Sequence, residues 1–100
     1  MNPLPAEYVK RLCAFVLKID MPLPTLQRIL AFLTGRKILV ENIQMNATSS
    51  GEAILILHCQ VEKDRIRHTQ NLLEKMEGIE KVELLESKMT HTSRQNADHY

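Results

Sequence analysis

Residues 11–34 decide the fold; they read Arg-Leu-Cys-Ala-Phe-Val-Leu-Lys-Ile-Asp-Met-Pro-Leu-Pro-Thr-Leu-Gln-Arg-Ile-Leu-Ala-Phe-Leu-Thr. The run from Arg11 to Ile19 is rich in β-forming residues and apolar on both faces in its middle, which is typical of a central strand. The prolines within residues 20–24 cannot continue a strand ladder, and Pro24 suits the first position of a helix. This stretch therefore predicts a strand, a tight turn and a helix over residues 24–34.

The predicted helix has one apolar stripe with the spacing i, i+3, i+4 and i+7: Leu26, Ile29, Leu30 and Leu33. Gly35 is the expected C-cap. Arg36 and Lys37 place positive charge at the negative end of the helix dipole. These signals indicate a helix that buries one face against a sheet.

A hairpin is expected next, with strands over residues 38–47 and 52–62. The apolar phase of the first strand slips by one residue near Glu41 and Asn42, which indicates a β-bulge. Thr48 to Gly51 has the composition of a hairpin loop. Along the second strand, alternate apolar residues predict one inward face: Ala53, Leu55, Leu57, Cys59 and Val61.

A second helix is predicted to begin at Lys63, with Asp64 as its N-cap and Gly78 as a left-handed C-cap. Its inward face comprises Ile66, Leu73 and Met76, with Thr69 or Gln70 between them. A last strand follows over residues 79–86, and Val82 and Leu84 are expected to point inward.

This order predicts an α+β, ferredoxin-like βαββαβ fold, with a four-stranded antiparallel sheet in the order 4-1-3-2 and two helices on one face. Residues 11–86 form the domain, residues 1–10 an irregular lead-in, and residues 87–100 a polar, disordered tail. The first and third strands are apolar on both faces. We therefore expect the helix-free face or an edge of the sheet to meet a partner.

Composition bounds the function. The 100 residues carry a net charge of +1, which does not favour capture of nucleic acid or of an anionic membrane. No apolar run reaches the roughly 20 residues that span a bilayer. Cys13 and Cys59 lie inside apolar runs, so we expect buried free thiols and a cytoplasmic protein.

The sequence shows no constellation typical of catalysis or of a metal site. The histidines lack metal-ligand spacing, and no phosphate-binding glycine loop is present. The expected central strands offer only Phe15 as an aromatic platform for bases, which argues against RNA binding. We therefore predict no catalytic residue, no metal and no cofactor. A ligand carboxylate could bind the helix N-terminus near residues 20–25. Alternatively the prolines there make only a stiff turn.

Two segments resemble the ACT domain family, and in particular the short regulatory subunit of acetolactate synthase. They are Asp-Met-Pro-Leu-Pro-Thr-Leu-Gln-Arg-Ile-Leu-Ala-Phe-Leu, residues 20–33, and Arg-Lys-Ile-Leu-Val-Glu-Asn-Ile-Gln-Met, residues 36–45. The resemblance covers residues 11–86. It implies side-by-side homodimers with a continuous eight-stranded sheet. It also implies a catalytic large subunit that holds thiamine diphosphate, FAD and magnesium.

Family members bind an amino-acid effector with a loop that resembles Asn-x-Pro-Gly followed by Leu-x-Arg. The corresponding positions here, together with the start of the second strand, give the candidate ligand-binding residues: Asp20, Met21, Leu23, Pro24, Thr25, Leu39 and Val40. Pro24 stands at or beside the glycine, and Leu39-Val40 replaces the Asn-Ile of valine-binding members. These departures resemble the valine-insensitive type of subunit.

The sequence thus predicts a non-catalytic regulatory subunit that activates a thiamine-dependent acetolactate synthase in branched-chain amino-acid biosynthesis. One alternative is a stand-alone amino-acid-sensing ACT protein. A small acylphosphatase-like enzyme on the same fold is a further alternative. Arg28 and Asn42 could serve such an enzyme, but no phosphate-cradling loop accompanies them.

Overall fold

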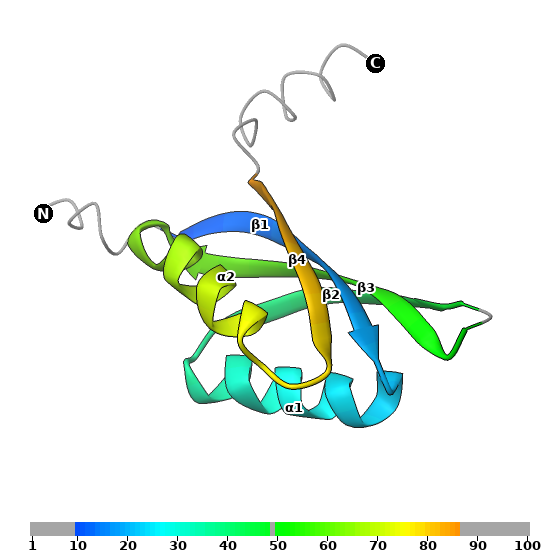
Figure 1. The fold of residues 1–100 in the computed structure, drawn as a ribbon. Coiled ribbons are helices and arrows are strands. Elements are labelled where there is room, and N and C mark those ends of the chain that lie inside the picture. Colours follow the sequence, from blue (N-terminus) through cyan, green and yellow to red (C-terminus); the bar gives the residue numbers. More distant parts are fainter. Residues whose placement is uncertain (1–9, 49, 87–100) are drawn as a thin grey trace, which may run out of the picture.

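The computed structural model describes residues 10–48 and 50–86 as a four-stranded antiparallel sheet with two α-helices packed on one face (Figure 1). The elements in chain order are β1 (Lys10–Asp20), α1 (Pro22–Gly35), β2 (Leu39–Ala47), β3 (Glu52–Glu62), the 3-10 helix η2 (Lys63–Arg65), α2 (Ile66–Glu74) and β4 (Ile79–Glu86). The sheet order β2-β3-β1-β4 confirms the predicted ferredoxin-like fold and its two central strands.

The sequence predicted irregular segments at both ends of the chain, over residues 1–10 and 87–100. Lys10 is instead the first residue of β1, and residues 1–9 and the predicted tail over residues 87–100 lie outside the described residues. Within the described part of the chain, the helices are too short or too polar to cross a membrane.

The core lies between the helices and the two central strands. β1 and β3 pair along their full lengths, from Lys10 opposite Glu62 to Asp20 opposite Glu52. The alternate β3 residues predicted to point inward are all 0–2% exposed. They pack with buried residues of β1 and of both helices: Phe15, Leu17, Ile29, Leu33, Ile66 and Leu73. The period-two pattern of the sequence therefore identified the core face correctly.

The predicted β-bulge is present in the edge strand β2. Its register against β3 shifts between Val40 and Asn42, and beyond the shift Ile43 and Met45 lie opposite Leu57 and Leu55. The extra residue returns the apolar side chains of β2 to the helix face after the slip.

Helix α1 begins two residues earlier than the sequence predicted. Pro22, not Pro24, is its first residue, and Met21 before it adopts a left-handed conformation with φ of 47°. Thr25 is fully buried, whereas Leu26 and Leu30 of the predicted stripe are only partly buried. The chain turns at Met21, so the helix can begin at Pro22. Left-handed backbone is uncommon for a non-glycine residue, and the sequence pattern therefore did not reveal this turn.

The end of α1 also differs from the prediction. Gly35 is the last helical residue and is not left-handed; Lys37 has the positive φ, at 60°. The Arg36 amide donates to the carbonyls of Phe32 and Leu33, and the Lys37 amide donates to that of Thr34. These bonds satisfy the last carbonyls of the helix without a glycine cap.

The second helical segment starts as the 3-10 helix η2, so Asp64 lies inside that turn and provides no side-chain cap to α2. Thr69 fills the position between Ile66 and Leu73, and all three are buried. Helix α2 ends at Glu74, before Gly78. Gly78 has the predicted positive φ, 90°, but it belongs to the turn that leads into β4 rather than to a helix cap.

The face of the sheet that the helices leave uncovered is apolar in its middle. The residues of this open face alternate with the core residues of β1, β3 and β4: Leu12, Ala14, Val16, Ile54, Ile56 and Leu85. Asn42, Gln44 and Asn46 border them on β2, since these residues lie opposite His58, Ile56 and Ile54. The predicted two-sided hydrophobicity of the central strands is therefore present.

Candidate functional site

The segment predicted to bind a ligand, which we call the β1–α1 loop, comprises Asp20 at the end of β1, Met21, and the first turn of α1 (residues 22–25). Met21 and Leu23 are each 67% exposed, and Pro24 is exposed beside them. Asp20 is exposed at the end of β1, whereas Thr25, in the first turn of α1, is fully buried. Of these residues, Thr25 therefore cannot present its side chain to a ligand from solvent.

Hydrogen bonds tie this loop to the turn between α2 and β4. The Thr25 hydroxyl donates to the Asp20 carbonyl, and the Asp20 amide donates to the Gly78 carbonyl at 2.7 Å. The Arg28 guanidinium donates to the Glu77 carbonyl at 3.2 Å and to the Thr25 hydroxyl at 3.3 Å. The polar groups of the loop are thus used inside the protein, and Arg28 acts as a brace between two segments.

The N-terminus of α1 has few groups that could bind an anion. Pro22 and Pro24 lack backbone N–H groups, and the Thr25 amide donates to the Met21 carbonyl at 3.0 Å. The carboxyl groups of Asp20, Glu52 and Glu80 lie together beside this end of β1, and their negative charge would repel the carboxylate of a ligand. This geometry disfavours the carboxylate end of an amino acid.

Leu39 and Val40, the other two candidate residues, open β2 after α1 ends. Helix α1 has 14 residues, so the loop and the start of β2 lie about 20 Å apart, at opposite ends of the helix. One protomer therefore does not bring the seven candidate residues together. A site that uses both groups requires a second chain.

Three carboxyl groups meet where β1 ends and β3 and β4 begin. One carboxylate oxygen from each of Asp20, Glu52 and Glu80 lies within 4.8 Å of the other two. Lys18 Nζ lies 3.7 Å from Glu52 Oε1. Hydrogen bonding to Glu52 and then to Asp20 raises the pKa of Glu80 to about 7, and the same bond to Glu80 lowers the pKa of Glu52. A proton held by Glu80 thus relieves the repulsion within this carboxylate cluster.

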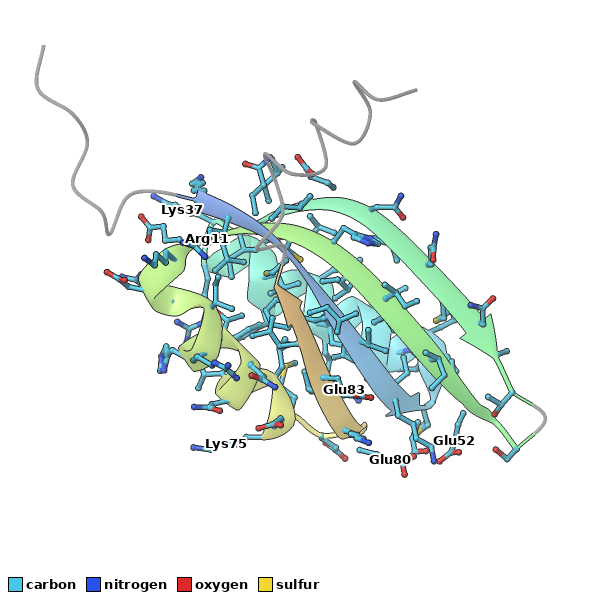
Figure 2. All side chains as sticks on the ribbon, turned by 90° about the horizontal axis from the view of Figure 1, so that it is seen from above. Arg11, Lys37, Glu52, Lys75, Glu80 and Glu83 are labelled. Atoms are coloured by element: carbon cyan, nitrogen blue, oxygen red, sulfur yellow. The ribbon has the colours of Figure 1, made fainter. Side chains whose placement is uncertain are left out.

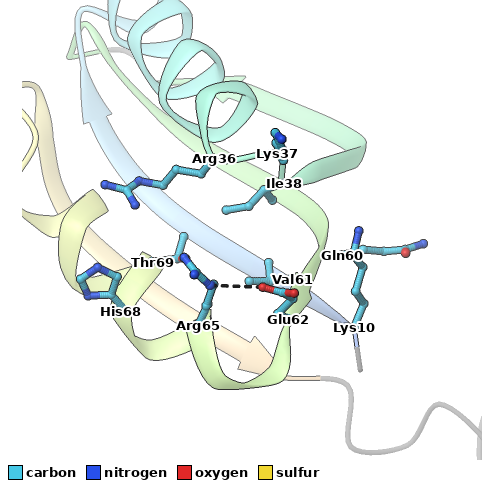
Figure 3. Close-up of a pocket in the computed structure, with 10 residues that line it drawn as sticks. All are labelled: Lys10, Arg36, Lys37, Ile38, Gln60, Val61, Glu62, Arg65, His68 and Thr69. Atoms are coloured by element: carbon cyan, nitrogen blue, oxygen red, sulfur yellow. Dashed lines mark ion pairs between the residues drawn. The ribbon is translucent and has the colours of Figure 1, made fainter. Parts of the chain in front are cut away.

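A pocket with a volume of about 350 Å³ lies at the other end of the sheet, between the end of α1 and the start of the second helical segment (Figure 3). Four of its lining residues are cationic: Lys10, Arg36, Lys37 and Arg65. Ile38 and Val61 form an apolar part of the lining. We call it the basic pocket. Figure 2 shows the polarity along the strands, with Arg11 and Lys37 at one end and Glu52 and Glu80 at the other.

Sequence reasoning missed both of these clusters, because their members are scattered along the chain. The carboxylates occupy the ends of three strands, and the antiparallel strand order alone could have placed Asp20, Glu52 and Glu80 at one end of the sheet. The sequence signal for the basic pocket was the pair of cationic residues Arg36 and Lys37. The sequence analysis attributed their positive charge to the helix dipole and therefore did not expect a ligand there.

The two cysteines are buried thiols, as the sequence predicted. Cys13 and Cys59 lie directly opposite each other on β1 and β3, both are buried, and neither forms a disulfide. Burial raises the pKa of Cys59 to about 11, so its reactive thiolate form is scarce at neutral pH.

Comparisons with known proteins bear on the fold. No protein-family profile matches the sequence, and no curated protein matches it. Among solved structures, the ACT domain of the GTP pyrophosphokinase of Chlorobium tepidum is 19% identical with a TM-score of 0.65, and the match covers 77% of this chain and all of that domain.

Two further structures share this architecture. A homoserine dehydrogenase from Thiobacillus denitrificans matches 83% of this chain with 18% identity and a TM-score of 0.65, but this chain spans only 19% of that enzyme. The 30S ribosomal protein S6 of Thermotoga maritima matches 90% of this chain and 99% of its own, with 9% identity and a TM-score of 0.65. These likenesses establish an ACT-like, ferredoxin-like fold, and they span proteins of different functions.

Proposed function

We propose that this chain is a non-catalytic, ACT-like regulatory subunit of the cytoplasm that works through protein contacts. The observation that carries the proposal is the open face of the sheet. Its apolar centre is built around Val16, Ile54 and Ile56, and neither helix of residues 10–48 and 50–86 covers it; Leu85 on β4 is 59% exposed. Contiguous apolar surface on a folded domain marks an interaction site.

A second copy of the chain is the first occupant that this face fits. Neutral amides border the apolar centre on β2, and on β4 Lys81 Nζ pairs with Glu83 Oε1 at 3.9 Å. The apolar centres of two such faces carry no charge and can pack against each other.

The catalytic partner proposed here is the large subunit of a thiamine-dependent acetolactate synthase. Its support is the resemblance of residues 20–33 and 36–45 to the short regulatory subunit of that enzyme. A regulatory subunit shifts its partner toward the state that it binds more tightly, and its effect is limited by that difference in affinity. The internally bonded loop at Asp20–Thr25 supports a subunit that stabilises its partner without sensing an amino acid.

The test is to purify both chains from the same organism and to measure acetolactate formation from pyruvate while this chain is titrated in. We expect co-elution of the two chains and a saturable increase in rate. A variant with Ile56 changed to lysine separates the open face from other surfaces, with Leu23→Lys as the matched control. No co-elution and an unchanged rate in excess of this chain would remove the acetolactate synthase assignment.

A further inference from the structure

The basic pocket is the feature that the proposed function leaves unused. It lies at the end of the sheet opposite the carboxylate cluster. Its lining comes from the start of β1, the connection between α1 and β2, the end of β3, and the η2–α2 segment. We propose that this pocket binds a small organic anion with two or more negative charges, carried by phosphate or carboxylate groups.

Charge supports this assignment first. Glu62 is the only acidic residue among the ten that line the pocket, against four cationic side chains. Glu62 Oε1 already pairs with Arg65 Nε at 3.2 Å. Among residues 10–48 and 50–86, Lys10, Arg36 and Lys37 form no ion pair. The pocket therefore has an excess of three positive charges in a chain whose total is +1.

Preorganisation is the second support. The Arg36 guanidinium is held over the Phe32 ring at 4.8 Å from the ring centroid, and Glu62 restrains Arg65. In Figure 3, Arg36 extends from the end of α1 toward α2, and Arg65 extends from η2 into the space between them. Guanidinium groups present paired N–H donors that match phosphate and carboxylate oxygens. Two restrained arginines facing one cavity suit a ligand with more than one anionic oxygen.

Size and shape favour a small molecule over a nucleic acid or an acidic protein. The volume of about 350 Å³ falls within the roughly 300–1,000 Å³ of small-molecule sites. Ile38 and Val61 provide an apolar wall for the carbon part of such a ligand. A polymer would instead require a basic surface that extends beyond one cavity.

Isothermal titration calorimetry of the full chain at low salt tests the proposal with three separate probes: ATP, citrate and inorganic phosphate. We expect ATP or citrate to bind one site per chain with a dissociation constant at or below about 1 mM. Phosphate alone should bind more weakly. A preference for ATP identifies phosphate esters as the class, and a preference for citrate identifies polycarboxylates.

The double variant Arg36→Gln/Arg65→Gln should weaken binding at least about tenfold. The control Lys75→Gln/Lys81→Gln removes the same charge elsewhere, since Figure 2 places Lys75 far from Lys37, and it should stay within about twofold. Lys10→Gln provides a milder test if the double variant unfolds, because Lys10 is exposed at the start of β1.

Three results would overturn the proposal. One is the absence of binding by all three probes. Another is an equal loss of affinity in the control, which indicates general charge attraction. The third is binding of polyglutamate or of a single-stranded oligonucleotide in the absence of any small-anion binding. None of these results depends on the acetolactate synthase assay, so this inference and the proposed function can fail separately.

Discussion

Gly78 lies directly against Thr25. A β-carbon added to Gly78 would be 2.6 Å from Thr25 Oγ1 and 3.0 Å from Arg28 Nη2. The Thr25 hydroxyl donates to the Asp20 carbonyl, and Thr25 is fully buried, so it has no room to withdraw. Only glycine allows the turn before β4 to approach α1 this closely.

Gly78→Ala should therefore destabilise the protein by more than the cost of its backbone conformation alone. The left-handed φ costs about 1–2 kcal/mol for an alanine, and the clash with Thr25 adds to it. Gly51→Ala is the matched control, because Gly51 has φ of 84° but no atom within 4 Å of an added β-carbon. Urea unfolding should show a clearly larger loss for Gly78→Ala. Equal losses in the two variants would contradict the close contact.

The carboxylate cluster predicts a dependence of stability on pH. The pKa of Glu80 is about 7 in the folded protein, above its ordinary value of 4.5. The folded state thus holds a proton that the unfolded state releases, and the stabilisation from this group is lost as pH rises from about 4.5 through 7. The free energy of unfolding should fall over this window.

Glu80→Gln should flatten that fall and raise stability at about pH 8 relative to the wild type. Glu83→Gln is the control, because Glu83 is exposed on the same strand and pairs with Lys81 instead of the cluster. Urea unfolding at a series of pH values gives the slopes. A Glu80→Gln slope identical to the wild-type slope would show that Glu80 holds no proton above its ordinary range.

Valine, leucine and isoleucine should bind weakly or not at all. Pro22 and Pro24 remove two N–H groups from the first turn of α1, and Asp20 with its neighbouring carboxylates opposes a ligand carboxylate. Calorimetric titration with each amino acid should show no dissociation constant below about 1 mM. A micromolar signal from any of the three would favour the stand-alone sensor over the subunit proposed here.

Dimerisation through the open face is the prediction that concerns quaternary structure. Sedimentation should show a homodimer at micromolar concentration, and Ile56→Lys should shift it toward the monomer, because a lysine would place charge in the apolar centre. Leu23→Lys adds the same charge at an exposed site outside that face and should leave the dimer intact. A dimer that survives Ile56→Lys would instead indicate edge-to-edge pairing into an eight-stranded sheet.

The strands were predictable because their side chains alternate. The bounds of β3 and β4, residues 52–62 and 79–86, agree with the sequence prediction, and so does the bulge between Val40 and Asn42. Period-two burial leaves a direct trace in the sequence, and a phase slip marks the bulge.

The helix ends were less predictable because their backbone conformations use residues with no special preference for them. Met21 and Lys37 are left-handed, although neither is a glycine or an asparagine. The sequence predicted Gly35 as the cap, but the left-handed residue that closes the turn is Lys37. Glycine is the residue that local propensity favours at a helix C-cap. Here the amides of Arg36 and Lys37 instead bind the last carbonyls of the helix.

The candidate sites depended on information that a linear pattern lacks. The start of α1 was predicted two residues too late, and the hydrogen bonds from Asp20 to Gly78 and from Arg28 to Glu77 join positions about 50 to 60 residues apart. The basic pocket likewise combines Lys10 with Arg65. Such juxtapositions follow from strand order and helix packing, which the sequence predicted only as a topology.

The separation of charge along the strands has an electrical consequence. The 11 residues of β3 span about 36 Å, which exceeds the screening length of about 10 Å at 0.1 M salt. At that salt concentration the basic pocket and the carboxylate cluster, the two charged poles of the sheet, each attract or repel an approaching charge independently. When the salt falls to about 0.01 M the screening length approaches 30 Å, and the poles then act as one dipole. A charged partner would then exert a torque on the molecule and turn one end toward itself before any contact forms.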